Sequence, residues 1–155
     1  MSSRTGTVVS LNVSNGGVPK RAVARARVTV GGMEGDRQRD LRHHGGPDRA
    51  LCLFSADIIA ALRTEGHPIE PGMVGENVTI SGLDWWLLRP GVQIDIGEVG
   101  VELTSYAMPC RNITPAFADG RSVRISQKLH PGESRLYARV LREGVLAVGD
   151  PVVVR

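Results

Sequence analysis

The stretch Val92–Tyr106, "VQIDIGEVGVELTSY", decides the fold class of this sequence. Its apolar residues recur at every second position on both sides of Gly97 and Glu98, which is the pattern of strands with one buried face. Glycine beside a charged residue is typical of a tight turn. The stretch therefore predicts two β-strands that turn at Gly97–Glu98.

The same signals extend in both directions from this stretch. Toward the C-terminus, "SRLYARVLREGVLAVGDPVVVR" (134–155) predicts two more strands that turn at Glu143–Gly144, with a further turn at Gly149–Asp150. Toward the N-terminus, strands are predicted in "TGTVVSLNVS" (5–14), "AVARARVTV" (22–30), "RALCLFS" (49–55) and "GENVTISG" (75–82).

One helix is expected over 56–65. Ser55 is placed to cap its first turn, Asp57 suits the positive end of the helix dipole, and Gly66 and Pro68 end the helix. Several strands with a single helix and short connections predict a mainly β protein, a closed or nearly closed β-barrel with one or two short helices. The 155 residues fit one domain, 1–155.

The composition excludes several classes of protein. The net charge of +3 is mild and suits a small anion as well as nucleic acid. Six aromatic residues, with Trp85 and Trp86 adjacent, offer little stacking surface for nucleic-acid bases. No apolar run approaches the ~18 residues of a membrane span. Two cysteines cannot form a disulfide framework, so a cytoplasmic location with reduced thiols is expected.

The two cysteines have different surroundings. Cys52 lies in the apolar run "LCLFS" and is expected to be a small buried residue. Cys110 lies in "SYAMPCRNI" (105–113), after Pro109 and before Arg111 and Asn112. A cationic neighbour in a partly open loop favours the thiolate, which is both a nucleophile and a soft metal ligand. Cys110 is therefore the candidate functional thiol, with burial as a small hydrophobe as the alternative.

A charged stretch precedes the third strand, "DRQRDLRHHGGPDR" (36–49). Its arginines, including Arg37 and Arg49, and the Gly45–Gly46 pair would cradle a phosphate or another oxyanion. The alternative is a solvated loop in which Asp36, Asp40 and Asp48 neutralise the arginines. His43 and His44 are adjacent and point apart in an extended chain, so they are not expected to chelate one metal together.

Three segments together resemble the MOSC family, named for the C-terminal domain of molybdenum cofactor sulfurase. "GMEGDRQRDLRHHGGPDRAL" (32–51) resembles the family's charged motif, "GENVTISGL" (75–83) its middle motif and "MPCRNI" (108–113) its cysteine motif. The terminal "SRLYARVLREGVLAVGD" (134–150) is also similar to the family. The resemblance is to its small stand-alone bacterial members.

This resemblance implies a β-barrel whose functional cysteine, Cys110, either accepts sulfur from a pyridoxal-phosphate-dependent cysteine desulfurase or ligates the metal of the molybdenum cofactor. It also implies two alternatives, a molybdenum-dependent reductase component for N-hydroxylated compounds and a non-catalytic cofactor carrier. A reductase would need a separate redox partner. Candidate cofactor-binding residues on the motifs are Arg37, His43, His44, Arg49, Glu76, Asn77, Arg111 and Asn112.

Overall fold

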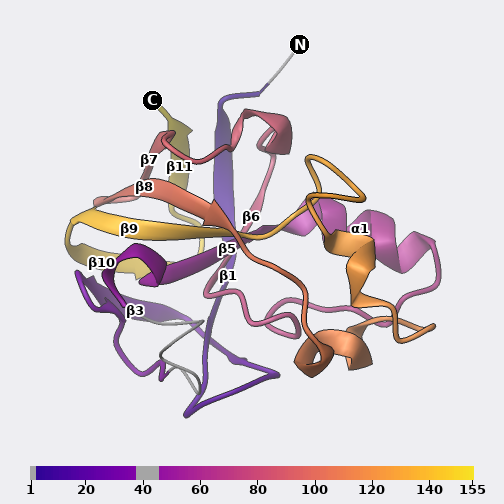
Figure 1. Ribbon diagram of the computed structural model, residues 1–155. Coiled ribbons are helices and arrows are strands. Elements are labelled where there is room, and N and C mark those ends of the chain that lie inside the picture. Colours follow the sequence, from indigo (N-terminus) through magenta and orange to yellow (C-terminus); the bar gives the residue numbers. More distant parts are fainter. Residues whose placement is uncertain (1–2, 38–45) are drawn as a thin grey trace.

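The fold is a mainly β structure built around a barrel (Figure 1). A computed structural model describes residues 3–37 and 46–155. Within these ranges, seven strands close on themselves in the order β11–β7–β8–β9–β5–β6–β1, because β1 also pairs with β11. The expected closed β-barrel is confirmed. The barrel strands are β1 (Thr5–Val13), β5 (Leu51–Ser55), β6 (Val78–Ser81), β7 (Gln93–Ile96), β8 (Val99–Tyr106), β9 (Leu136–Arg142) and β11 (Pro151–Val154).

Apolar residues at alternate positions of the strands point inward and fill the barrel core. In the β7–β8 pair, Ile94, Ile96, Val101 and Leu103 are buried, whereas Gln93 faces solvent. Closure satisfies the backbone groups of these Val-rich strands within one sheet and leaves the seven barrel strands no free edge. The fold class therefore follows from the period-2 pattern that the sequence shows.

The barrel is mixed because β5 and β6 run parallel. Parallel neighbours need a crossover connection, and the helix α1 (Ala56–Thr64) lies in it (Figure 1). The Ser55 hydroxyl caps α1 by accepting a hydrogen bond from the Ile58 N–H, and Ile59 and Leu62 are buried. The expected helix is confirmed.

A second, small sheet lies beside the barrel in the order β10–β3–β4, and β2 extends the edge of β1. Its arrangement differs from the expectation in two ways. The predicted strand 22–30 divides at Ala24, since β2 pairs with β1 while β3 pairs with β10. The C-terminal segment forms three strands, and β10 pairs with β3 after the turn at Glu143. These elements are β2 (Arg21–Val23), β3 (Arg25–Thr29), β4 (Gly32–Met33) and β10 (Gly144–Ala147).

Four short 3₁₀ helices occur in the described ranges, more short helical turns than expected. Two of them flank the candidate site, because η1 closes the charged stretch and η3 begins directly after Cys110. No helix in residues 3–37 and 46–155 is long and apolar enough to cross a membrane. The four are η1 (Pro47–Arg49), η2 (Trp85–Leu87), η3 (Arg111–Ala116) and η4 (Ser122–Ile125).

Candidate functional site

Cys110 lies just beyond the end of β8, at the N-terminal boundary of η3. Its side chain is half-buried, and its carbonyl accepts a hydrogen bond from the Ile113 N–H at 3.3 Å. Pro109 precedes it and cannot donate to a strand ladder, so the β8 pairing stops before this point. The thiol is therefore presented from a turn at the rim of the barrel.

Tyr137 on β9 lies near two of the predicted site residues, Arg49 and Cys110. Burial raises the pKa of Tyr137 to about 12, and the nearby Cys52 and Cys110 thiols contribute to that rise. The guanidinium of Arg49 lies over the Tyr137 ring, 5.3 Å from its centroid, as in a cation–π contact. Arg49, from the charged stretch, therefore contacts Tyr137, and Cys110, from the cysteine motif, lies within electrostatic reach of the same side chain.

The second thiol, Cys52, lies next to Tyr137. It is the cross-strand partner of Tyr137 in the β5–β9 pair and packs with Ala107 and Tyr137 in a small apolar cluster. Only 5% of its surface is exposed, and burial raises the pKa of its thiol to about 11. The structure agrees with the expectation that Cys52 is a packing residue.

The charged stretch is anchored to the barrel at both described ends. Asp36 forms an ion pair with Lys20, with 2.6 Å between Nζ and Oδ1 and both side chains 4% exposed. Asp48 pairs with Arg139 on β9 at 3.3 Å, and its carbonyl accepts a hydrogen bond from the Thr104 hydroxyl. The two carboxylates therefore hold the described ends of the stretch, at Asp36 and Asp48, against the rest of the fold.

The middle motif (75–83) contributes a buried asparagine that connects two parts of the site. Asn77 is fully buried, and its side-chain amide donates to an Asp36 carboxylate oxygen at 2.9 Å. Its Oδ1 accepts the Cys52 N–H at 2.9 Å. Asn77 thereby connects the start of the charged stretch with the strand that faces Tyr137.

Glu76 is also fully buried, and its carboxylate is engaged by protein donors. The Gly72 N–H donates to Oε1 at 3.0 Å and the Thr79 hydroxyl donates to Oε2 at 3.1 Å. Burial raises the pKa of Glu76 from 4.5 to about 7. Gly72 has φ +88°, and a Cβ there would lie 2.6 Å from the Lys20 carbonyl oxygen, so this position requires glycine.

The remaining predicted residues are placed as follows. Arg37 is exposed, and its backbone N–H donates to the Ser14 carbonyl at 2.7 Å. Arg111 and Asn112 are exposed on η3, and neither side chain makes a hydrogen bond within the part of the chain that the structure describes. His43 and His44 lie outside the described residues. Whether these residues contact a ligand stays a prediction.

Sequence reasoning missed three residues that shape this region, namely Lys20, Arg135 and Tyr137. Arg135 is 4% exposed, and its guanidinium donates to the carbonyls of Val74 and Met108. Nothing in the local pattern separates Arg135 from the exposed arginines of the neighbouring strands. Tyr137 stands in a predicted strand, and only the β5–β9 register reveals that it faces Cys52.

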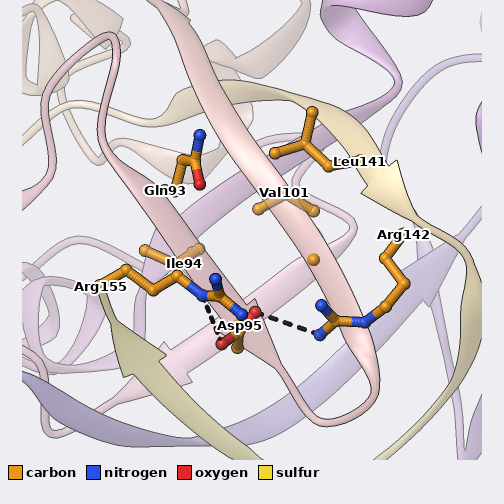
Figure 2. Close-up of a pocket in the computed structure, with 8 residues that line it drawn as sticks. Gln93, Ile94, Asp95, Val101, Leu141, Arg142 and Arg155 are labelled. Atoms are coloured by element: carbon orange, nitrogen blue, oxygen red, sulfur yellow. Dashed lines mark hydrogen bonds and ion pairs between the residues drawn. The ribbon is translucent and has the colours of Figure 1, made fainter.

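A pocket of about 180 Å³ lies elsewhere, over β7, β8 and β9. Figure 2 shows Asp95 between Arg142 and Arg155, with ion-pair distances of 3.1 and 2.8 Å. Cys110 and Arg49 are not among its lining residues. Among residues 3–37 and 46–155, no group of three or more His, Cys, Asp or Glu side chains is placed to hold a metal ion. A metal here would depend on the thiol of Cys110 and on ligands from the cofactor itself.

Comparison with known proteins finds relatives across most of the chain. The model of the MOSC domain matches residues 40–153. The uncharacterized protein YflK of Bacillus subtilis (strain 168) is 31% identical over 118 residues, which are 76% of this chain and 52% of YflK. The chain thus spans about half the length of this curated relative.

Solved structures share the fold. YiiM from Geobacillus stearothermophilus superposes with a TM-score of 0.71 and 26% identity, covering 97% of this chain and 75% of YiiM. The YUAD protein from Bacillus subtilis has a TM-score of 0.77 and 20% identity, covering 99% of this chain and 98% of that one. Because the superposition with the YUAD protein covers nearly all of both chains, it supports the barrel fold along the whole of this chain.

Proposed function

The chain belongs to the MOSC domain family, and we propose that it handles the molybdenum cofactor, sulfur, or both through the thiol of Cys110. The observation that carries this proposal is the contrast between the two thiols. Cys110 is half-buried and lies within electrostatic reach of Tyr137, whereas Cys52 is 5% exposed and packed. Of the two thiols, Cys110 is the accessible one, and a reactive cysteine needs access.

As a sulfur carrier, Cys110 would act on a persulfide held by a pyridoxal-phosphate-dependent cysteine desulfurase. The Cys110 thiolate attacks the outer sulfur of that persulfide, and a new S–S bond forms on Cys110. The S–S bond of the donor breaks, and the donor cysteine leaves as a thiolate. The step needs no external oxidant, because one S–S bond replaces another.

The residues at this site also fit the molybdenum cofactor by their chemistry. A thiolate is a soft ligand for its metal, and the guanidinium of Arg49 is a forked donor for its phosphate. Arg37, His43, His44, Arg111 and Asn112 are further candidate contacts. Glu76 and Asn77 are buried and engaged, so we assign them to positioning. When bound, the cofactor would supply oxygen-atom transfer or reduction at the metal.

The experiment uses protein produced in a host that synthesises the cofactor. Molybdenum by elemental analysis, pterin by fluorescence and persulfide on Cys110 by mass spectrometry are measured on the wild type, Cys110→Ser and Cys52→Ser. We expect molybdenum or persulfide sulfur in the wild type and in Cys52→Ser, and neither in Cys110→Ser. Equal amounts in all three proteins would refute the role of Cys110.

The same measurements separate the alternatives. A reductase component retains molybdenum and pterin and oxidises a chemical electron donor when an N-hydroxylated compound is added. A carrier retains the cofactor without that turnover, and a sulfur carrier gains 32 Da on Cys110 only when a desulfurase and cysteine are present.

A further inference from the structure

We infer that Arg135 is a positioning residue that holds the segment carrying Cys110 in place for sulfur transfer or metal ligation. The inference rests on the proposed function of Cys110 and adds a residue that none of the three motifs contains. It starts from the way Arg135 joins the cysteine motif to the middle motif.

Arg135 ties together segments that are far apart in the sequence. Its Nη1 donates to the Val74 carbonyl at 2.8 Å, and its Nη2 donates to the Met108 carbonyl at 3.2 Å. Its own carbonyl accepts the Ala107 N–H at 3.0 Å. The chain is thus held at Ala107 and Met108, immediately before Pro109 and Cys110.

The side chain of Met108 is 82% exposed, so packing of that side chain does not fix the segment. The hydrogen bonds from Arg135 to the main chain do this instead. Because the proline that follows has a fixed φ, fixing Met108 also restricts the direction in which Cys110 is presented. Arg135 can therefore set the place of the thiol without touching it.

The cost of burying Arg135 argues against a role in stability alone. Arg135 is 4% exposed, and its Nε–H has no hydrogen-bond partner within the described ranges. A buried donor without a partner is unfavourable, and apolar replacements of buried charges are often neutral or stabilising. An apolar residue of similar length at position 135 would be expected to give a folded state that is equally or more stable.

Arg135 also brings a buried positive charge to this region. Its charge lowers the pKa of Glu76, Cys52 and Tyr137 against the larger effect of burial on each. The Arg135 guanidinium therefore acts electrostatically on all three residues, which come from different segments of the chain. An apolar residue at 135 would lose this link as well as the two hydrogen bonds.

The test compares Arg135→Met and Arg135→Lys with the control Arg142→Met. Arg142 lies on the adjoining strand β9 but is exposed and pairs with the carboxylate of Asp95, away from the candidate site. Each protein is incubated with a cysteine desulfurase and ³⁵S-cysteine, and sulfur on Cys110 is measured at a temperature equally far below its own Tm. Amide exchange is followed in peptides covering 105–113.

In Arg135→Met we expect sulfur transfer to fall roughly 10- to 100-fold, the size of loss that a misplaced reacting group produces. Exchange at Ala107 should accelerate, while peptides over 138–142 stay unchanged. Arg135→Lys keeps the charge and one donor group and should recover part of the transfer. Arg142→Met should behave as the wild type.

Two results would overturn the inference. One is transfer in Arg135→Met within about twofold of the wild type once the temperatures are matched, which would leave only a structural role. The other is unchanged exchange at 105–113. If Arg135→Met does not fold, full transfer and unchanged exchange in Arg135→Lys would overturn it equally. If the proposed function itself is wrong, wild-type Cys110 carries no sulfur in this assay. In that case the amide-exchange measurement still tests whether Arg135 holds the segment 105–113 in place.

Discussion

Asn77 holds Cys52 at both of its backbone groups. The Asn77 N–H donates to the Cys52 carbonyl at 2.8 Å, and the Asn77 Oδ1 accepts the Cys52 N–H at 2.9 Å. This contact lies one residue before Leu53–Val78, the first pair of the parallel β5–β6 ladder. The asparagine side chain therefore extends the ladder and fixes the strand from which Cys52 faces Tyr137.

Replacing Asn77 with alanine should destabilise the protein. The change leaves the Cys52 N–H and one Asp36 oxygen without this partner in a buried region, at a cost of about 1–3 kcal/mol. Urea unfolding followed by circular dichroism measures the change. Asn112→Ala, at an exposed asparagine, is the matched control and should be neutral. Equal stability of both variants would contradict this account.

Replacing Lys20 with methionine should be more damaging. The Lys20–Asp36 pair is buried, and removing one partner leaves an uncompensated charge, which typically costs about 3–5 kcal/mol. Arg63→Met breaks the exposed pair with Glu70 and should cost less than about 1 kcal/mol. Both values come from chemical denaturation at pH 7. A cost for Lys20→Met no larger than that for Arg63→Met would show that the buried pair contributes nothing.

Glu76 should give the protein a pH-dependent stability near neutrality. Its pKa is raised from 4.5 to about 7, so the folded state binds the proton more tightly than the unfolded state. Stability should therefore fall as pH rises from about 4.5 through about 7, by roughly 3 kcal/mol from this group.

Glu76→Gln tests this assignment, because glutamine keeps the shape and does not titrate. The free energy of unfolding, measured from pH 4.5 to pH 8, should fall less with rising pH in the variant than in the wild type. Glu70→Gln, at an exposed side chain, should keep the wild-type slope. Parallel curves for the wild type and Glu76→Gln would rule out titration of Glu76 as the cause.

The sequence was sufficient for the barrel because period-2 alternation and glycine turns are local signals. It correctly places the two strands around Gly97–Glu98 and the helix capped by Ser55. The pairing of β10 with β3 could not be predicted in this way. Residues 25–28 and 144–147 come together only because the barrel brings distant segments side by side, and nothing in either segment specifies its partner.

For the site, the sequence indicates which residue types are candidates for function, but it does not reveal the buried residues that hold them in place. Cys110 and Arg49 are predicted from their local chemistry; the structure places Arg49 over the Tyr137 ring and Cys110 within electrostatic reach of it, and their roles stay predictions. Glu76 and Asn77 were predicted as ligand contacts, yet both are fully buried, because polar residues beside a strand do not reveal whether protein or ligand satisfies them. Burial of Arg135 and Lys20 likewise depends on tertiary packing.

The last prediction concerns the reactivity of the two thiols. Alkylation with iodoacetamide requires access and a thiolate, and Cys52 lacks both. It is 5% exposed, and burial raises the pKa of its thiol to about 11, so the protonated form predominates at pH 8. Cys110 is half-buried at the rim, so it should be labelled first in the native protein, as mass mapping of the peptides would show.

Serine substitutions should separate the two roles in the same way. Cys52→Ser places a hydroxyl in the apolar cluster with Ala107 and Tyr137, which should cost about 1–3 kcal/mol and spare function. Cys110→Ser should leave the unfolding free energy nearly unchanged, because the side chain contributes little to the core, while sulfur acceptance or metal retention is lost. Faster labelling of Cys52 than of Cys110, or normal retention of sulfur and cofactor by Cys110→Ser, would refute the assignment of Cys110 as the functional thiol.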